Sequence, residues 1–237
     1  MEQWTEDDRH ALATTRDAQG FFDYCATVAM QLDFDSCSFG LALPLPVSRP
    51  EIVIYNNYPG RWWQRYAQER YVDVDPTIRH AVTSCAPIFW SDTAFATAPH
   101  MWEDVKAHGL QIGWGQPTRD GSGAKGMLTL ARGGAPIGPR ELAEHSPRMA
   151  YMAQLMMVGI TAVVLPQMVP ESGARLTPRE REIMRWTADG KTSYEIGRIL
   201  SLSISAVNFH IANAVVKLNA VNKTQAVVKA AMLGLLL

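Results

Sequence analysis

The sequence predicts an α+β protein with two domains: an N-terminal α/β/α sandwich with an antiparallel sheet, and an all-α four-helix helix-turn-helix domain. The 237 residues, 47% of them hydrophobic, suffice for two modest cores. Helix and strand patterns mix in the first two thirds of the chain, whereas only helix patterns follow. A stretch rich in Pro, Ser and Gly separates these parts. We therefore expect domains over residues 1–165 and 176–237, joined by a linker over 166–175.

The N-terminal domain is predicted to contain helices at both ends and strands between them. Apolar side chains recur on one face of residues 20–32, which is typical of a helix. Strand patterns cover residues 37–43, 52–55, 113–119 and 127–131. The last two strands form a predicted hairpin, because residues 120–123 between them are turn formers. Residues 138–165 predict a long helix with Pro147 as a candidate break.

Large aromatic side chains gather in the middle of this domain. A short predicted helix places Trp62 and Tyr66 four residues apart on one face, just after Tyr58. Asp75 precedes a proline at a predicted helix start, and Trp90 ends an apolar strand pattern. Two interpretations stay open. The rings pack in the core with Asp75 as a helix cap only, or they line a pocket that is mostly apolar with a few fixed polar groups.

Four helices are predicted in the C-terminal domain. The first begins at Thr177, because Thr177-Pro178-Arg179-Glu180 combines a capping threonine, a proline and a glutamate at the right spacing, and Gly190 ends it. The others are predicted over residues 193–200, 203–218 and 224–236. The side chains predicted to face inward are Ile196, Ile199 and Leu200 in the second helix, and Val207, Ile211, Ala214 and Leu218 in the third.

The second and third of these helices are typical of a helix-turn-helix, in which the second element lies in the major groove of DNA. Residues 1–170 carry 13 Lys and Arg against 18 Asp and Glu, whereas residues 171–237 carry 9 against 5. The net charges of −5 and +4 indicate that the tail meets a polyanion. Candidate DNA-contacting residues are Lys191, Thr192, Ser205, Asn208, Ala212, Asn213, Lys217 and Lys223. A helical packing module with no DNA role remains the alternative.

The chain resembles a known family in both domains. The tail is similar to the LuxR-type DNA-binding domain at Leu176–Glu180, Trp186–Thr192, Glu195–Leu200, Val207–His210, Lys217-Leu218 and Asn222-Lys223. The front is similar to the autoinducer-binding domain of LuxR quorum-sensing regulators at Tyr58-Pro59-Gly60, Trp62, Tyr66, Asp75-Pro76, Trp90, Gly113 and Pro117. The chain departs from the family at Ser205-Ala206, where many members have Arg-Thr, so the third helix begins with fewer charged contacts.

The resemblance implies a cytoplasmic transcriptional regulator that binds an N-acyl homoserine lactone and, as a homodimer, binds double-stranded promoter DNA. It implies that Trp62 donates its indole N–H to the lactone carbonyl and that Asp75 accepts the ligand amide N–H. The other implied roles are Tyr58 and Thr129 at the acyl carbonyl, Tyr66 and Trp90 packing on the lactone, and Ser38 and Met127 lining the acyl tunnel.

A homodimer is also expected because one domain with so few cations binds DNA weakly. Two third helices then read a palindromic site about one helical turn apart. The stretch 139–165, rich in Met, Leu and Val, is the candidate dimer surface, and burial within its own domain is the alternative.

The sequence gives little support to an enzyme, a cofactor or a metal site. Residues 121–126 match G-x-G-x-x-G, but they link two predicted strands instead of opening a helix. The six histidines show no metal-binding spacing, and no nucleophile motif occurs. A response regulator with a phosphorylated aspartate and a lactone hydrolase are therefore the weaker alternatives.

We expect a reducing compartment without membrane insertion. The three cysteines, Cys25, Cys37 and Cys85, form no disulfide pattern, and Cys85 beside Ala86 is predicted to be buried packing. Residues 1–8 are acidic and lack the apolar stretch of a secretory signal. The most apolar stretch, 155–169, is shorter than the roughly 20 residues that span a bilayer.

Overall fold

The structure is a computed structural model that describes residues 6, 10, 14 and 17–237. The acidic segment 1–8, where the sequence predicts no secretory signal, therefore lies outside the described residues except for residue 6. The chain forms two compact units. The first contains the residues up to 42 together with 52–120 and 125–164, and the second contains residues 165–237 with the short segments 43–51 and 121–124.

The first unit is built on a five-stranded antiparallel sheet. Its strands are β1 (Ser36–Ala42), β2 (Ile52–Asn56), β3 (Ile88–Phe89), β4 (Ile112–Arg119) and β5 (Lys125–Arg132), in the spatial order β2-β1-β5-β4-β3. The β4–β5 hairpin predicted from the turn residues is present. Ser38 lies opposite Thr129 and Gly40 lies opposite Met127 in the β1–β5 pair. This register brings four cavity-lining positions to the centre of the sheet.

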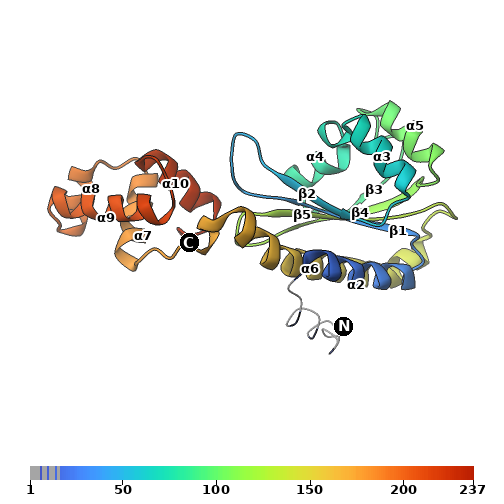
Figure 1. Ribbon diagram of the computed structural model, residues 1–237, viewed down its shortest axis with the longest axis horizontal. Coiled ribbons are helices and arrows are strands. Elements are labelled where there is room, and N and C mark those ends of the chain that lie inside the picture. Colours follow the sequence, from blue (N-terminus) through green and yellow to red (C-terminus); the bar gives the residue numbers. More distant parts are fainter. Residues whose placement is uncertain (1–5, 7–9, 11–13, 15–16) are drawn as a thin grey trace. The chain divides into compact units, whose positions relative to one another are not determined.

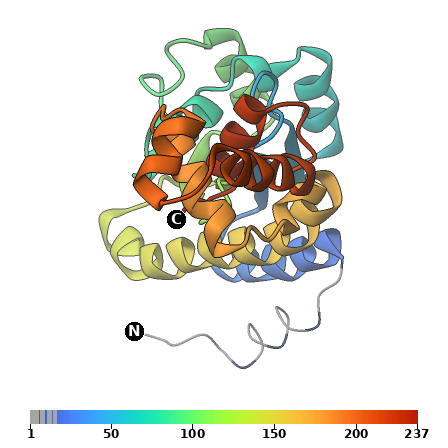
Figure 2. The same ribbon diagram turned by 90° about the vertical axis from the view of Figure 1, so that its left-hand side faces the viewer.

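Helices cover both faces of the sheet, as Figure 1 and the turned view in Figure 2 show. The helices are α2 (Ala18–Gln31), α3 (Gly60–Gln68), the 3₁₀ helix η1 (Tyr71–Asp73), α4 (Pro76–Thr83), α5 (Pro99–Ala107) and α6 (Pro139–Met168). Helices α2 and α6 lie against one face, and α3, α4 and α5 lie against the other. The predicted α/β/α sandwich with an antiparallel sheet is confirmed.

Helix α6 runs without interruption through Pro147, so the candidate break was wrong. A proline removes the bond to the carbonyl four residues earlier, and that residue, Ala143, is exposed, so water can satisfy the freed carbonyl. The helix also extends to Met168, and the 3₁₀ helix η2 (Pro170–Gly173) follows it within the segment predicted as linker.

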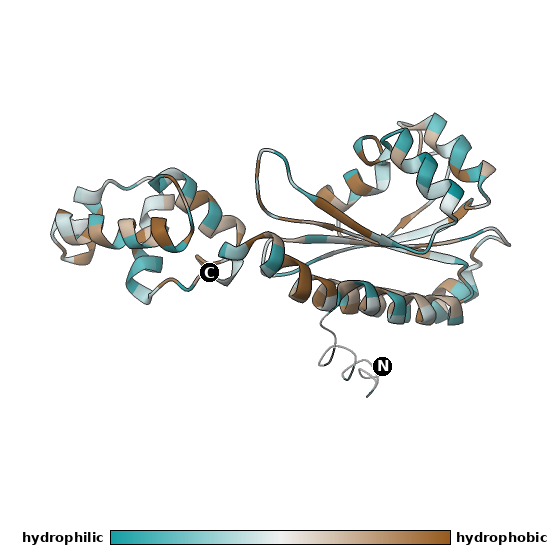
Figure 3. Ribbon diagram, in the orientation of Figure 1, coloured by the Kyte–Doolittle hydropathy of each residue, from teal (hydrophilic) through white to brown (hydrophobic). Residues whose placement is uncertain are grey.

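Helix α6 is long and apolar enough to cross a membrane by length and composition. This corrects the expectation that the most apolar stretch, residues 155–169, is too short to span a bilayer. However, 61% of its most apolar 18-residue window is buried inside the protein. Figure 3 shows the apolar colouring of its C-terminal half, and the ring of Phe21 from α2 lies so close to Gly159 that a Cβ there would be 2.1 Å from the ring. A core helix of a globular domain is buried in this way.

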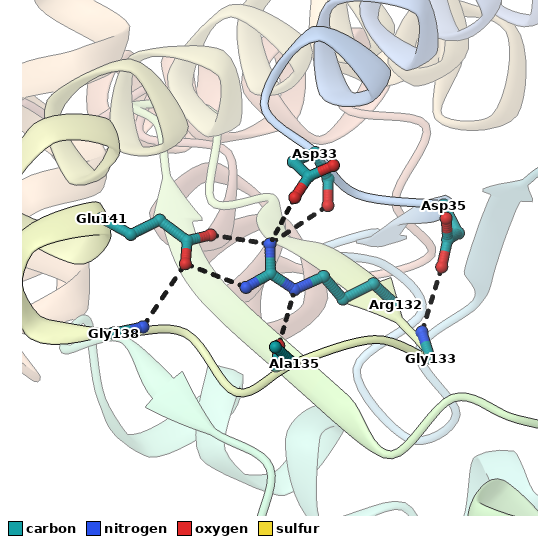
Figure 4. Close-up of polar contacts among 7 residues, drawn as sticks. All are labelled: Asp33, Asp35, Arg132, Gly133, Ala135, Gly138 and Glu141. Atoms are coloured by element: carbon teal, nitrogen blue, oxygen red, sulfur yellow. Dashed lines mark hydrogen bonds and ion pairs between the residues drawn. The ribbon is translucent and has the colours of Figure 1, made fainter.

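One buried arginine joins the end of β5 to the helices on that face (Figure 4). The Arg132 side chain is 6% exposed, and its Nη1 lies 2.7 Å from Glu141 Oε1 and 3.2 Å from Asp33 Oδ2. Its Nη2 and Nε donate to Glu141 Oε2 and to the Ala135 carbonyl. The hydrogen bond from Arg132 lowers the pKa of Glu141. This ion pair fixes the first turn of α6 against the sheet.

The second unit contains the four predicted helices: α7 (Pro178–Ala188), α8 (Ser193–Leu200), α9 (Ile204–Lys217) and α10 (Lys223–Met232). The predicted capping box at Thr177 and Glu180 is confirmed, and a second one joins Thr192 to Glu195. The predicted inward stripe of α9 is buried at all four positions.

Three local predictions in the sequence were wrong. Ile199 is 44% exposed, because the inward face of α8 is centred on Ile196 and Gly197, where a Cβ would lie 2.7 Å from the Leu202 carbonyl oxygen. Helix α10 ends at Met232, and Gly234 then takes a positive φ of 67°. Cys85 is exposed, because the loop that carries it after α4 lies at the surface, and Ala86 and Pro87 are exposed with it.

Candidate ligand-binding cavity and DNA-binding helices

The first unit contains a cavity of about 60 Å³ between the sheet and helices α3 and α4. All eight side chains predicted to bind ligand line it: Ser38, Tyr58, Trp62, Tyr66, Asp75, Trp90, Met127 and Thr129. The other lining residues are Gly40, Ile52, Ile54, Trp63, Thr77, Ile78 and Met101. The cavity is smaller than the several hundred Å³ of most small-molecule sites, so a ligand enters only if lining side chains move apart. The flexible Met101 and Met127 are suited to such movement.

Asp75 both caps helix α4 and lines the cavity, so each of the two interpretations left open by the sequence, a helix cap and a polar group of a pocket, describes part of its role. Its Oδ1 accepts the backbone N–H of Thr77 at 2.8 Å and the Thr77 hydroxyl at 2.6 Å, which caps α4. Its Oδ2 accepts the Tyr66 hydroxyl at 3.0 Å and keeps capacity for a further donor. Burial raises the pKa of Asp75, although the hydrogen bonds from Thr77 and Tyr66 act in the opposite direction.

Other polar groups around the cavity are unpaired. Within the described residues, the structure gives no side-chain hydrogen bond to the Trp62 indole N–H, the Tyr58 hydroxyl or the Thr129 hydroxyl. Burial and the nearby charge of Asp75 raise the pKa of Tyr58, so this hydroxyl stays protonated and able to donate. Of the cavity groups that the structure describes, Trp90 Nε1 is fully buried and has no partner. Unpaired groups of this kind are costly unless a second molecule satisfies them.

Aromatic rings hold these groups in place. Trp62 meets Tyr66 edge-on with ring centres 5.8 Å apart, and Trp63 stacks on Tyr66 at 5.4 Å. Trp90 packs edge-on against Phe95 at 5.7 Å. The face of Trp90 also lies directly over Gly113, where a Cβ would be 2.1 Å from the ring. The cavity wall is therefore rigid on the aromatic side.

Sequence reasoning missed helix α5 and seven lining residues. Met101 belongs to α5, whose N-cap Ala98 makes no side-chain hydrogen bond, so Pro99 was its one start signal. Ile52 and Ile54 alternate along β2, and this spacing is a signal that identifies them as facing one side of the sheet. Thr77 follows the cap at Asp75 by two residues, where a capping partner is expected.

The DNA-binding candidates lie at the starts of α8 and α10 and along α9. Ser205, Asn208 and Ala212 are exposed on α9, Asn213 is half-buried, and Lys191, Thr192 and Lys223 lie at the starts of α8 and α10. Asn208 Oδ1 accepts the Ser193 hydroxyl at 2.7 Å. Phe209, which the sequence analysis did not select, is 62% exposed on α9.

Like Asn208, two further candidates, Lys217 and Thr192, have contacts within the domain. Lys217 Nζ lies 2.7 Å from Oε2 of the buried Glu180. Burial acts to raise the pKa of Glu180, but the hydrogen bonds from Lys217 and Thr177 lower it overall. Thr192 uses its hydroxyl in the second capping box. The charge of Lys217 is thus largely neutralised within the domain, and α9 offers DNA a mostly uncharged face.

Two stretches of the chain match known families. Residues 17–157 match the autoinducer binding domain, and residues 174–230 match the bacterial regulatory proteins of the luxR family. The chain belongs to the LuxR family. The transcriptional activator SolR of Ralstonia solanacearum is 42% identical over 236 residues and covers 100% of both chains. The quorum-sensing regulator RhlR of Pseudomonas aeruginosa is 35% identical and covers 98% of this chain and 96% of its own.

Solved structures of this LuxR-family fold agree. A crystal structure of Escherichia coli SdiA matches with a TM-score of 0.82 and 33% identity over 99% of this chain and 98% of SdiA. SdiA in complex with octanoyl-rac-glycerol matches with a TM-score of 0.78 and 32% identity at the same coverage. An autoinducer-binding domain lies where a response regulator has its receiver domain, so that alternative is wrong.

As a LuxR-family member, the chain is a quorum-sensing transcriptional regulator with an N-terminal autoinducer-binding domain and a C-terminal helix-turn-helix. The family consists of transcriptional regulators, so the lactone hydrolase alternative is also wrong. Among the described residues, no three His, Cys, Asp or Glu side chains come together as a metal site requires.

Proposed function

We propose that the cavity binds an N-acyl homoserine lactone, and that the protein acts in the cytoplasm as a homodimer that reads a palindromic promoter site through α9. The observation that carries this is the combination of one half-buried carboxylate, Asp75, with donors that have no partner in the described part of the chain, among them Trp62, Tyr58 and Thr129, around one cavity. The ligand has one amide donor, two carbonyl acceptors and an apolar tail, so the two sets are complementary.

The polar head of the ligand has a partner for each group. An amide N–H buried without an acceptor costs about 1–3 kcal/mol, and Asp75 Oδ2 has capacity for it. Trp62 donates to the lactone carbonyl, and Tyr58 and Thr129 donate to the acyl carbonyl. Tyr66 and Trp90 pack on the lactone ring.

The tail lies along the sheet. Ser38 and Met127 line this side of the cavity from β1 and β5. Octanoyl-rac-glycerol, which SdiA binds, also joins a polar head to an acyl chain. Because a bound ligand satisfies the unpaired donors and stabilises the folded state by mass action, soluble protein is expected to increase when lactone is present.

Binding is tested on the full chain. Equilibrium titration with N-butanoyl, N-hexanoyl, N-octanoyl, N-decanoyl and N-dodecanoyl homoserine lactones should identify at least one saturable ligand, recovered unchanged by mass spectrometry. Asp75→Asn keeps an Asn cap on α4 and should weaken that affinity at least tenfold, about 1.4 kcal/mol. Asp73→Asn is the matched control, since the Asp73 side chain is 55% exposed, pairs with Arg70 and does not line the cavity. No saturable binding, or equal affinities for both variants, contradicts the proposal.

The homodimer is tested separately. Sedimentation of the lactone-bound protein with a palindromic DNA should give two chains per duplex, because one α9 with few free cations binds DNA weakly. The Met-, Leu- and Val-rich α6 remains the candidate dimer surface, although its apolar window is mostly buried and the exposed Val158 is one of few apolar side chains on it that are free for contact. A one-to-one complex of full affinity contradicts the dimer.

A further inference from the structure

A second set of contacts holds Trp62 from residues that do not line the cavity. The Trp62 ring is 2% exposed and stacks with Tyr71 of η1 at 6.0 Å between ring centres. It also packs against His108, the residue after α5, at 5.5 Å. Neither Tyr71 nor His108 lines the cavity. The orientation of the Trp62 indole therefore depends on where these two rings are fixed.

One residue of α5, Asp104, contacts both rings: Tyr71 through its carboxylate and His108 through its backbone carbonyl. Asp104 Oδ2 accepts the Tyr71 hydroxyl at 2.6 Å and the Arg65 Nε–H at 2.6 Å. Arg65 lies three residues after Trp62 on the same helix, α3. The Asp104 backbone carbonyl oxygen lies 2.7 Å from His108 Nδ1. Asp104 is thus the common partner of α3, of η1 and of the residue that ends α5.

The charge of Asp104 strengthens this arrangement. Hydrogen bonds to an ionised group are about twice as strong as neutral ones. The hydrogen bond from Tyr71 is the main cause that lowers the pKa of Asp104, and Arg65 adds to it, so the carboxylate stays ionised at neutral pH. Burial and the Asp104 hydrogen bond raise the pKa of Tyr71 to about 12, so Tyr71 remains a donor.

We propose that Asp104 is a positioning residue for Trp62: it holds Tyr71 and Arg65 so that the indole N–H is aimed into the cavity at the ligand's ring carbonyl. This inference rests on the proposed function, because it presumes the lactone carbonyl as the acceptor. Asp104 itself does not line the cavity, so its contribution is to the preference for a ring carbonyl and not to general affinity.

The test compares two probes on the full chain: N-octanoyl homoserine lactone and N-octanoyl cyclopentylamine, which has the same amide and tail but no ring carbonyl. Dividing the two dissociation constants gives the carbonyl preference. Asp104→Asn and Tyr71→Phe should each reduce this preference about tenfold and leave cyclopentylamine affinity nearly unchanged. Tyr71→Phe keeps the stacked ring, so it decides the question even if Asp104→Asn does not fold.

Two controls separate the possible failures. Glu103→Gln removes a neighbouring carboxylate of α5 that is 71% exposed and paired with Lys106, and it should leave the preference unchanged. Trp62→Phe should abolish the preference, and adding Asp104→Asn to it should have no further effect. If Trp62→Phe keeps the preference, the assignment of Trp62 as the donor to the ring carbonyl is wrong. A second outcome separates the two claims. Trp62→Phe loses the carbonyl preference, whereas Asp104→Asn and Tyr71→Phe either keep this preference or weaken the binding of both probes equally. That result overturns the positioning role of Asp104 and leaves the proposed ligand site intact.

Discussion

The two domains use their polar side chains in opposite ways. In the C-terminal unit, the capping side chains pair within a few residues, Thr177 with Glu180 and Thr192 with Glu195, and more distant polar groups such as Lys217 and Glu180 are also paired. In the N-terminal unit, the groups around the cavity come from positions as far apart as Tyr58 and Thr129, and several lack a partner. Local pairing stabilises helices and is complete without a second molecule. Unpaired donors beside an apolar cavity indicate a site that a ligand completes.

The largest expected effect contrasts a buried ion pair with an exposed one. Arg132→Leu should reduce the free energy of unfolding of the N-terminal domain by about 3 kcal/mol, because it leaves Glu141 without its charge partner. Arg179→Leu in α7 is the matched control. Its partner Glu182 and Arg179 itself are 46% and 42% exposed, so its removal should change stability very little. Urea denaturation of each variant measures both.

The pH dependence of the Arg132 effect is a second check on its cause. The pKa of Glu141 lies below its ordinary value of 4.5 in the folded protein, so the stabilisation is present above that value and disappears as the pH falls through the folded pKa. The difference between wild type and Arg132→Leu should therefore shrink in acid. A difference that is constant with pH contradicts the ion pair as the cause.

The next largest effect concerns the close contact behind Trp90. Gly113→Ala introduces a Cβ at 2.1 Å from the Trp90 ring, so the ring must shift toward the cavity. Overpacking of this kind costs about 1–3 kcal/mol, and lactone affinity should fall with it. Gly60→Ala is the control, since no atom lies within 4 Å of the added methyl group.

The double variant Gly113→Ala with Trp90→Leu tests the cause, because the smaller side chain makes room for the methyl group. Measured by thermal unfolding, the stability of this variant should be partly restored relative to Gly113→Ala, whereas its lactone affinity should stay low. Equal stability of Gly113→Ala and wild type means that the ring moves freely, which contradicts a rigid aromatic wall.

A smaller effect is expected in the pH profile of ligand binding. Because burial raises the pKa of Asp75 above its ordinary value of 3.8, the folded protein without ligand favours the protonated carboxyl, and ionisation lowers stability as the pH rises to the folded pKa. The ligand amide N–H is a better partner for the ionised form. Affinity should therefore be highest above the folded pKa and decrease as the pH falls through it.

The matched variant for this profile is Asp75→Asn, which has no titrating group at this position. Its affinity should be flat over the same pH range, measured by equilibrium titration. A parallel decrease in wild type and Asp75→Asn assigns the pH dependence to another group and contradicts the role of Asp75 as the amide acceptor.

Local signals explain why the C-terminal unit was predictable from sequence. Thr177 and Glu180, three residues apart, mark the start of α7 through their capping box, and the inward stripe of α9 follows a simple helical period. The prediction that Ile199 faces inward was wrong because the buried Gly197 lets the Leu202 backbone approach α8, and this rotates the inward face of the helix. The spacing of apolar residues along the sequence does not reveal this contact.

The cavity was predictable in part. The residue pattern itself singled out Tyr58, Trp62, Tyr66, Asp75 and Trp90, the family resemblance added Ser38, Met127 and Thr129, and the structure brings all eight to the cavity. Helix α5 was missed because Ala98 offers no cap, although α5 supplies Met101 to the cavity and Asp104 behind Trp62. Contacts between positions 62 and 104 depend on tertiary packing, for which a single sequence carries no periodic signal.

The smallest expected effect separates the two roles assigned to Thr192, as a helix cap and as a DNA contact. Its Oγ1 accepts the Glu195 backbone N–H at 3.2 Å, so Thr192→Ala should destabilise α8 by about 1 kcal/mol, measured by hydrogen exchange of the amides of residues 193–196. Thr192→Ser keeps the capping hydroxyl and should keep this protection. If DNA affinity falls in Thr192→Ala and is restored in Thr192→Ser together with protection, the cap accounts for both effects. If protection is lost and DNA affinity is unchanged, Thr192 has no role at the DNA interface, and its capping box serves folding alone.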